Sequence, residues 1–224
     1  MNSFSSRDYD MTQINNEKEA KAIDIIRSAL VKSKNPCVCF SGGKNSLVLL
    51  NYLIEYGPSD LSVIYIDTGS EFPEVQSYIK KVKKLWKLNL IIVKSEEQFN
   101  ETPKKNDCSC NYRKEETLVR ILSQRNYDCV LIGDTSESLT SLSNTVITYP
   151  ELLSVIVKPL FQFTSNDIWN HIREHNLPLC SLYEKGYQKI DCVSCSRMNQ
   201  IAENTLIQDD EEIIKEKLKK LGYL

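Results

Sequence analysis

The sequence of 224 residues lacks long apolar runs and carries little net charge. No segment reaches the roughly 20 consecutive apolar residues that a membrane-spanning helix needs, and residues 1–10 are too polar for a signal peptide. We therefore expect a cytoplasmic protein that has no membrane partner. The net charge of −2 neither requires nor excludes nucleic acid as a partner.

Histidine is also scarce, and both copies lie in the segment His171-Ile172-Arg173-Glu174-His175. This spacing matches the His-x-x-Glu-His pattern of inverted zincins and puts both imidazoles on one face of a helix. Because no further ligand-bearing motif follows, we interpret the match as coincidental.

Cysteine is abundant by comparison, with eight residues. In a reducing compartment this number favours metal or cluster ligation over disulfides. Cys37 and Cys39 alternate along an expected strand, and we interpret them, with Cys129 and Cys180, as core residues.

The other four cysteines form two closely spaced pairs on separate predicted loops. They are Cys108, Cys110, Cys192 and Cys195. Thiolates from two such pairs suit either a tetrahedral Zn²⁺ ion or a 4Fe-4S cluster, and we favour ligation. One alternative is that the pairs are incidental. The other is that Cys192 and Cys195 form a thioredoxin-like redox pair, although such a motif should open a helix directly after the first strand.

A glycine-containing turn, the glycine loop, joins the expected strand at 37–40 to an apolar run long enough for a buried helix. Its residues are Ser41, Gly42, Gly43, Lys44, Asn45 and Ser46. The glycines allow a tight turn that leaves several N–H groups pointing into one concavity at a helix N-terminus. Serine hydroxyls, the lysine charge and the helix dipole add to the attraction for phosphate. We favour phosphate binding over an ordinary strand-to-helix turn, and the Walker spacing is not met.

Apolar strands alternate with amphipathic helices, which predicts an α/β fold with a mostly parallel sheet and helices on both faces. The predicted strands are 37–40, 61–66, 90–93, 129–132 and 154–159, and the segment before Pro150 is typical of a loop. The predicted helices include 17–31, 73–87, one that begins at a Thr164 capping box, and 209–221. Ligands of such sheets lie beyond the carboxyl ends of the strands, so Asp67 should face the same crevice as the glycine loop.

We expect three segments: a mobile N-terminus at 1–16, one folded domain at 17–197 and a C-terminal helical extension at 198–224. Within the domain, the predicted helix at 73–87 carries a run of lysines opposite its apolar face. They are Lys80, Lys81, Lys83, Lys84 and Lys87. A solvated face explains this run better than a nucleic-acid site does.

Several short motifs occur in a specific order between residues 20 and 197. They are Ser41–Ser46, Tyr65–Gly69, Phe72-Pro73, Lys158–Leu160, Thr164–Ile172, Leu177-Pro178, Leu182-Tyr183, Gly186-Tyr187 and Ile190–Cys195. Each motif alone is weak, but together they resemble the phosphoadenosine phosphosulfate (PAPS) reductase family of the PP-loop ATP pyrophosphatase superfamily.

The resemblance implies a Rossmann-like, adenine nucleotide alpha-hydrolase-like fold that binds ATP with Mg²⁺. It implies catalytic roles for Lys44 and Asp67. The residues that it assigns to the nucleotide, its phosphates and Mg²⁺ are Ser41, Gly42, Gly43, Lys44, Asn45, Ser46, Asp67, Thr68, Arg113, Lys114, Gly133 and Asp134. In the adenosine phosphosulfate (APS) reductases of this family, a Cys-Cys-x-x-Arg-Lys motif and a CxxC hold a 4Fe-4S cluster. This implies cluster ligation by Cys108, Cys110, Cys192 and Cys195, with Zn²⁺ as the alternative.

The sequence departs from the family pattern at four points. Asn45 stands where aspartate is expected, and Ser109 stands where the first cluster cysteine belongs, with Cys108 as its substitute. No cysteine follows Cys195, although sulfonucleotide reductases attack sulfur with a thiolate near the C-terminus. Asp134 replaces an arginine, which suits a Mg²⁺-bound triphosphate better than a phosphosulfate.

These departures favour an ATP pyrophosphatase-like enzyme that adenylates a substrate oxygen so that sulfur can replace it. Relatives of this kind imply tRNA or DNA as substrate, including DNA phosphorothioation systems. The implied partners are a cysteine desulfurase or other sulfur donor and further copies of the chain. A sulfonucleotide (APS or PAPS) reductase that releases sulfite is the second interpretation. A non-catalytic nucleotide- or cluster-binding subunit, which Asn45 favours, is the third.

Overall fold

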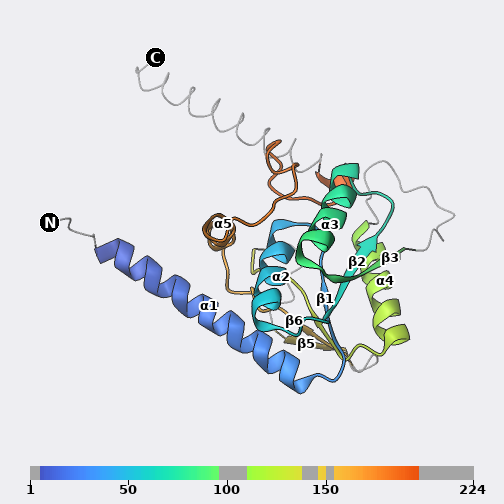
Figure 1. Cartoon of the computed structure of the whole chain (residues 1–224), viewed down its shortest axis with the longest axis horizontal. Coiled ribbons are helices and arrows are strands. Elements are labelled where there is room, and N and C mark those ends of the chain that lie inside the picture. The colour runs from blue at the N-terminus through green and yellow to red at the C-terminus, as the bar shows by residue number, and fades with distance from the viewer. Residues whose placement is uncertain (1–5, 96–109, 138–145, 150–153, 197–224) are drawn as a thin grey trace, which may run out of the picture.

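The computed structural model describes residues 6–95, 110–137, 146–149 and 154–196 (Figure 1). Its six-stranded sheet consists of β1 (Pro36–Cys39), β2 (Ser62–Asp67), β3 (Asn89–Lys94), β4 (Cys129–Leu131), β5 (Val146–Tyr149) and β6 (Ser154–Val157). In the sheet order β3-β2-β1-β4-β6-β5, every neighbouring pair is parallel except β5 and β6. The chain leaves β1 toward β2 on one side and later crosses to β4 on the other. Open α/β sheets bind ligands at such a switch point, beyond the carboxyl ends of the strands.

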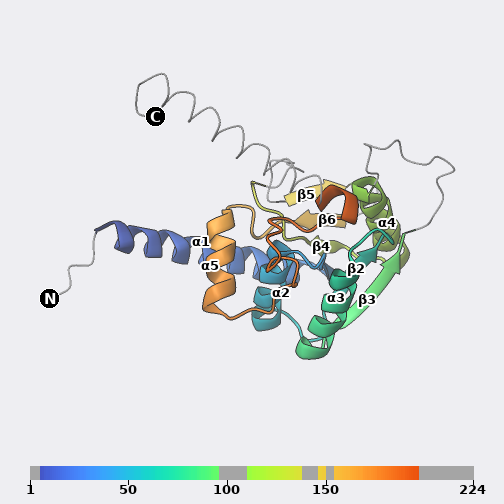
Figure 2. The same ribbon diagram turned by 90° about the horizontal axis from the view of Figure 1, so that it is seen from above.

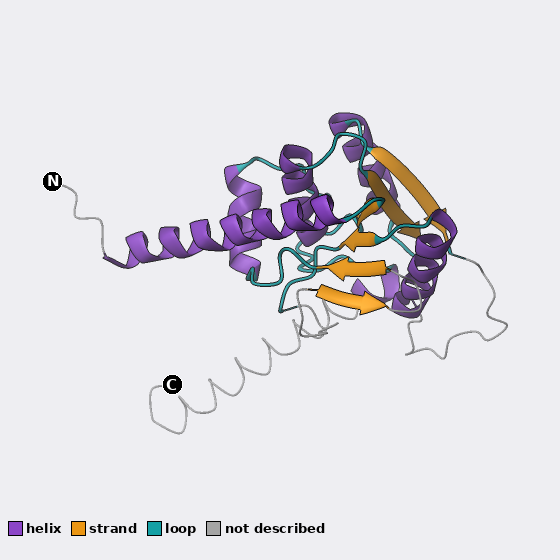
Figure 3. Ribbon diagram, turned by 90° about the horizontal axis from the view of Figure 1, so that it is seen from below, coloured by secondary structure: helices purple, strands orange, loops and turns teal. Residues whose placement is uncertain are grey.

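The described helices are α1 (Ser6–Lys32), α2 (Lys44–Tyr56), α3 (Pro73–Trp86), α4 (Cys110–Arg125) and α5 (Ser165–Glu174). Figure 2 shows α2 and α3 on one side of the sheet and α4 on the other. Figures 1 and 3 show that the N-terminal part of α1 extends past α5, away from the sheet. No helix in the described part of the chain is both long and apolar enough to cross a membrane.

Alternate side chains of the strands enter two separate apolar clusters. Val38 and Val63 pack in the larger cluster with residues of α1, α2, α3 and α5. Cys37 and Ile64, their neighbours in the chain, point to the other face and pack in the smaller cluster with Ile121 of α4. This alternation, which follows from the two-residue period of a strand, confirms the predicted sheet with helices on both faces.

Two boundaries differ from the prediction. The segment before Pro150 was predicted as a loop, but Val146–Tyr149 forms β5, which pairs antiparallel with β6. Four residues are too short for a recognisable period, and the pairing depends on β6. Residues 1–16, predicted to be a mobile N-terminus, include the start of α1, since this helix begins at Ser6. Residues 6–32 contain no glycine or proline that would stop the helix from extending. The predicted helix at 209–221 and the extension at 198–224 lie outside the described residues.

The capping box of α5 forms as predicted, because Asp167 N–H donates to the Thr164 hydroxyl and Thr164 N–H donates to the Asp167 carboxylate. On α3 the predicted apolar face is buried at Val75, Tyr78, Ile79 and Val82, but Leu85 is 58% exposed. The side chains of the predicted lysine run are all exposed: Lys80, Lys81, Lys83, Lys84 and Lys87.

The two histidines of α5 lie on one face, with ring centroids 4.1 Å apart. His171 is buried, and its Nε2 donates to the Asn51 side-chain oxygen at 2.8 Å. Its Nδ1 lies 3.1 Å from the Tyr52 hydroxyl and 3.4 Å from a Glu19 carboxylate oxygen. His171 therefore joins α5 to α1 and α2, which gives the His-x-x-Glu-His segment a structural role.

Candidate functional site

The glycine loop lies between the end of β1 and the first turn of α2. Gly42 has a φ of 81°, a left-handed conformation that favours glycine. A Cβ on Gly42 would lie 3.2 Å from Val75 Cγ1 and 3.3 Å from Ile79 Cδ1, so the loop packs tightly on α3. Gly43 is the N-cap of α2 and has no side chain to cap the first turn, which leaves the N–H groups there to other partners.

The two serine hydroxyls are engaged within the loop itself. Ser46 is buried, and its hydroxyl donates to the Gly43 carbonyl at 2.9 Å. A hydroxyl has one proton, so in the 3.1 Å contact between the two hydroxyls Ser41 is the donor and Ser46 the acceptor. The Ser41 oxygen in turn accepts from Gly43 N–H at 3.3 Å. The sequence predicts these hydroxyls as donors to phosphate, but here their protons hold the loop in shape.

Lys44 is held by the segment that follows α5. Its backbone N–H donates to the Tyr183 hydroxyl at 2.7 Å, and its ammonium donates to the Gln188 carbonyl at 2.9 Å. The ammonium lies 5.8 Å from the Trp169 ring centre and 6.0 Å from that of Tyr183, within cation–π range. Residues far along the chain therefore fix a positive charge beside the glycine loop.

The end of β4 touches the first turn of α2 at Gly133. A Cβ there would lie 2.8 Å from both the Asn45 carbonyl carbon and the Ser46 Cα, a distance at which any larger residue would clash with backbone. Gly133 therefore allows two elements to approach closely. The next residue, Asp134, is brought to the same edge of the sheet as the glycine loop.

Asp134 forms an ion pair with Lys158, which follows β6. The Asp134 Oδ2 and Lys158 Nζ atoms lie 3.2 Å apart, and the Lys158 side chain is only 4% exposed against 31% for Asp134. A buried ammonium without an anionic partner is costly, so this pair is structurally important. In the sequence, Lys158 stands out only as part of the family motif Lys158–Leu160. The signal that marks it is a charge inside the apolar run Val155–Leu160.

The loop after β2 has its own network of carboxylates. Asp67 accepts from Gly69 N–H at 2.9 Å. The Glu71 carboxylate is buried and accepts from both the N–H and the hydroxyl of Thr68, at 3.0 and 2.7 Å. Sequence reasoning missed Glu71, although a carboxylate three residues after Thr68 in a glycine turn is typical of a local cap. The network fixes the shape of this loop at the carboxyl end of the sheet.

Three of the four predicted metal ligands converge. The sulfur atoms of Cys110, Cys192 and Cys195 all lie within 4.8 Å of one another, and those of Cys110 and Cys195 are 3.6 Å apart. Cys110 and Cys192 are buried and Cys195 is partly exposed. In the described part of the chain this is the one group of three or more side chains that could hold a metal ion. Cys108 lies outside the described residues.

The remaining described cysteines belong to the interior, as predicted. Cys37, Cys129 and Cys180 are buried, and Cys39 is partly buried. Burial raises the pKa of the Cys37 thiol, and it raises that of Cys129 to about 11. These thiols stay protonated at neutral pH and are poor nucleophiles.

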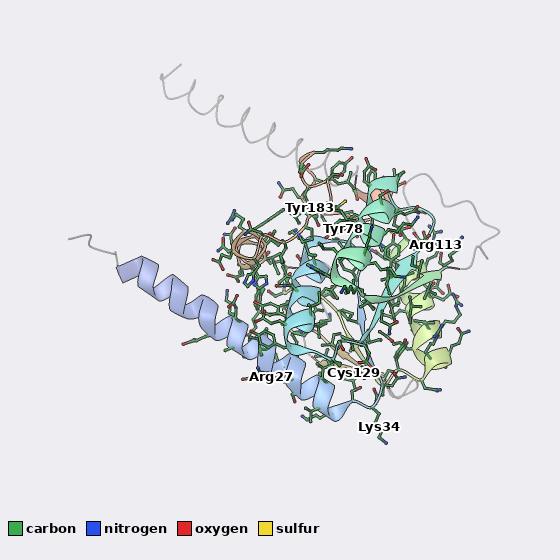
Figure 4. The ribbon with its side chains drawn as sticks, in the orientation of Figure 1. Arg27, Lys34, Tyr78, Arg113, Cys129 and Tyr183 are labelled. Atoms are coloured by element: carbon green, nitrogen blue, oxygen red, sulfur yellow. The ribbon has the colours of Figure 1, made fainter. Side chains whose placement is uncertain are left out.

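Arg113 connects the cysteine cluster to the loop after β2. It lies one turn after Cys110 on α4, and its guanidinium donates to the Thr68 carbonyl at 3.1 Å and the Ser70 hydroxyl at 3.0 Å. The Val193 N–H, inside the CxxC segment, donates to the Ser70 carbonyl at 2.8 Å. Figure 4 shows Arg113, Tyr78 and Tyr183 at the end of the molecule opposite Lys34. Lys114 follows on α4 and is partly buried.

The profile of the phosphoadenosine phosphosulfate reductase domain matches residues 35–198, which is most of the chain. The chain belongs to the PAPS reductase family. One relative is an adenosine 5′-phosphosulfate reductase of Halalkalibacterium halodurans. It is 30% identical to this chain over 201 residues, and the match covers 84% of this chain and 86% of the reductase. An uncharacterized protein of Methanocaldococcus jannaschii is 31% identical over 195 residues, 79% of this chain. The chain spans 46% of that relative and 40% of a second one from the same organism.

Solved structures of low sequence identity share the fold. The PAPS reductase of Candida auris in a phosphate complex has a TM-score of 0.66 at 21% identity, covering 86% of this chain and 97% of its own. The FMN adenylyltransferase of Candida glabrata with ATP has a TM-score of 0.64 at 19% identity, and the match covers 81% of this chain and 62% of the adenylyltransferase. The U34-tRNA thiolase NcsA of Methanococcus maripaludis with its 4Fe-4S cluster has a TM-score of 0.56 at 16% identity, and the match covers 94% of this chain and 80% of the thiolase. These likenesses confirm the predicted Rossmann-like, adenine nucleotide alpha-hydrolase-like fold.

Proposed function

We propose that this PAPS reductase family member is an ATP pyrophosphatase-like enzyme that adenylates a substrate oxygen so that sulfur can replace it. The observation that carries the proposal is the placement of two kinds of site along one sheet edge. The glycine loop follows β1, and the cysteine cluster is attached to the loop after β2 through Arg113 and Val193. A nucleotide-binding loop and a set of converging thiols are the two parts that ATP-dependent sulfur incorporation needs.

In this proposal ATP lies at the glycine loop, where the α2 dipole, backbone N–H groups and the Lys44 ammonium attract its phosphates. Asp67 and Asp134 offer carboxylates that would hold Mg²⁺, with Thr68 and Gly133 beside them. The substrate oxygen attacks the α-phosphorus, the bond to the bridging oxygen breaks, and pyrophosphate leaves. A hydrosulfide-type nucleophile then attacks the activated substrate atom, and AMP leaves with the original oxygen.

The cysteines fit an iron–sulfur cluster, since three sulfurs lie within 4.8 Å of one another and two of them are buried. Cys110, Cys192 and Cys195 would hold it, with Cys108 as the fourth ligand of the proposal. When bound, such a cluster supplies either a structural link or a carrier for sulfur. Zn²⁺ on the same thiolates would be structural. Arg113 and Lys114 lie on the same helix as Cys110 and supply positive charge for anionic groups.

We propose nucleic acid, tRNA or DNA, as the substrate class. The likeness to a tRNA thiolase supports this. In this proposal the exposed lysines between Lys80 and Lys87 would meet the phosphate backbone of the substrate. A cysteine desulfurase is the partner that would supply sulfur, and the ATP pyrophosphatase of a DNA phosphorothioation system is one form of the proposal. Further copies of the chain are compatible with it.

A sulfonucleotide reductase is the second candidate, because the similar protein of Halalkalibacterium halodurans is an APS reductase and 86% of its length is covered. Against it, residues 196–224 contain no cysteine, so this segment offers no thiolate to attack sulfur. The third candidate, a binding subunit without catalysis, is favoured by Asn45 at the position where the family has aspartate.

The proposal is tested by pyrophosphate release from ATP with tRNA or DNA present. Lys44→Ala should lower the release rate about 100-fold or more, because it removes the charge nearest the glycine loop. Lys34→Ala is the control, since this exposed lysine lies at the opposite end of the molecule from Tyr183, which holds Lys44 (Figure 4). Unchanged release in Lys44→Ala would remove the glycine loop from the reaction. Sulfite release from APS with thioredoxin would favour the reductase, and ATP binding without turnover the binding subunit.

A further inference from the structure

The Tyr183 hydroxyl lies directly against the glycine loop. It accepts the Lys44 N–H of the first turn of α2 at 2.7 Å, and a Cβ on Gly43 would lie 3.7 Å from its oxygen. Tyr183 comes from the segment after α5, far along the chain. The hydroxyl thus reaches the spot where backbone N–H groups face any anion bound at the loop.

Several contacts hold Tyr183 in this position. Its ring packs edge-on against Trp169 at a centroid distance of 5.5 Å. The segment is attached to α3 by the Tyr78 hydroxyl, which donates to the Pro178 carbonyl at 2.7 Å, and by the Lys185–Glu74 ion pair, also at 2.7 Å. The hydroxyl is therefore fixed before any ligand arrives, and little conformational entropy is lost on binding.

The proton of this hydroxyl is available for a ligand. A phenol oxygen can accept one hydrogen bond while its own O–H donates another. Among the described residues, one hydrogen bond involves the Tyr183 hydroxyl. In that bond Lys44 N–H is the donor and the phenol oxygen is the acceptor. Burial raises the pKa of the phenol, so the O–H stays protonated at neutral pH.

We infer that Tyr183 is a further phosphate-binding residue, whose hydroxyl donates to a phosphate oxygen of the nucleotide at the glycine loop. The inference rests on the nucleotide binding of the proposed function and adds a donor that the loop itself lacks, because the Ser41 and Ser46 protons are engaged internally. The C-terminal half of the domain thereby takes part directly in phosphate recognition. Lys44 and Tyr183 together would present one charged and one neutral donor to the same group.

The experiment compares two ligands that differ only in phosphate: adenosine and a methylene analogue of ATP that cannot be cleaved at the α-phosphorus. Their affinities are measured by calorimetry on the full chain and on Tyr183→Phe, which keeps the ring and removes the O–H. We expect Tyr183→Phe to lower the affinity for the analogue about tenfold or more, because a hydrogen bond to a charged group is lost. The affinity for adenosine should stay unchanged.

Tyr56→Phe is the control, because it also removes one phenol hydroxyl but lies in the last turn of α2, at the opposite end of this helix from the glycine loop. It should not change the ratio of the two affinities. Equal weakening of both ligands in Tyr183→Phe, or an unchanged affinity for the analogue, would overturn the inference. Tighter binding of the analogue would overturn it too, since the hydroxyl would then occupy the place of the phosphate.

The result also separates the inference from the proposed function. If the wild-type chain binds neither ligand, the proposed function fails and the inference fails with it. If the wild type binds the analogue and Tyr183→Phe binds it equally well, only the inference fails. Melting curves of both variants fix a temperature at which each chain is folded, so the affinity ratio stays decisive even if Tyr183→Phe is less stable.

Discussion

Gly42 and Gly186 share a positive φ, 81° and 90°, but they differ in their surroundings. A Cβ on Gly42 would press on Val75 and Ile79, whereas one on Gly186 would meet nothing within 4 Å. Gly186→Ala should cost the strain of a left-handed alanine, about 1 kcal/mol, and Gly42→Ala about 2–3 kcal/mol because overpacking is added. Urea unfolding measures the difference. If both variants lose the same free energy of unfolding, α3 shifts to accommodate the added methyl group on Gly42 and does not fix the shape of the loop.

The Asp134–Lys158 pair gives a second prediction at the scale of single residues. Asp134→Ala should lower the free energy of unfolding by about 3 kcal/mol, because the Lys158 charge stays buried without its partner. Adding Lys158→Met should recover most of this loss, since the double variant buries no charge. Urea unfolding of the wild type, both single variants and the double variant measures the coupling.

The control for that cycle is the Lys189–Asp191 pair, at 3.0 Å, whose lysine side chain is 53% exposed. Lys189→Met should change stability by less than about 0.5 kcal/mol, because solvent screens an exposed pair. If the double variant is no more stable than Asp134→Ala alone, the stability lost in Asp134→Ala does not come from an unpaired Lys158 charge.

At the scale of whole elements, an ion pair and a hydrogen bond attach α1 to α5. Lys18 lies 2.6 Å from Asp167, and Glu19 lies 3.4 Å from His171. The hydrogen bond with His171 is the main cause that lowers the pKa of Glu19. Burial acts to raise the pKa of Asp167, but hydrogen bonds from Lys18 and Thr164 outweigh it and lower that pKa. Both carboxylates therefore favour the folded state in their charged form.

Acid should weaken this attachment. The folded-state pKa of each carboxyl lies below its unfolded value, so the stabilisation is present at neutral pH and is lost as the pH falls through the folded values. We expect the free energy of unfolding to fall between about pH 5 and pH 3, and to fall less in the double variant Glu19→Gln, Asp167→Asn. Urea unfolding at several pH values measures both slopes.

Glu74→Gln is the matched control for the acid prediction. The hydrogen bond with Lys185 also lowers the pKa of Glu74, but this pair is exposed and solvent screens it. Its pH slope should match that of the wild type. If the double variant of Glu19 and Asp167 also keeps the wild-type slope, other carboxyl groups govern the acid sensitivity.

At the scale of the molecule, the alternation of apolar strands and amphipathic helices sufficed to predict the fold. The spacing of the cysteine pairs, with the family resemblance, predicted the ligand group of which Cys110, Cys192 and Cys195 converge. The alternation did not reveal β5, whose four residues depend on pairing with β6. Lys158, Glu71 and Tyr183 were also missed as functional candidates, because their importance comes from partners distant in space or from burial. Sequence reasoning finds residues by type and spacing, whereas the ion pair of Lys158 and the bond from Lys44 N–H to Tyr183 exist only in the folded chain.

The cysteine cluster joins the start of α4 to the segment after α5, and its metal content tests the architecture as a whole. Anaerobically purified wild type should carry about four irons and four sulfides per chain, and Cys192→Ser should lose them, because three sulfurs converge within 4.8 Å. Cys180→Ser is the control, since this buried cysteine is outside the cluster and its variant should keep the metal. Iron, sulfide and zinc analysis with an absorption spectrum measures the outcome. Zinc in place of iron would keep the ligands but remove sulfur carriage from the proposal. Equal metal in Cys192→Ser and wild type would mean that these thiols converge for packing alone.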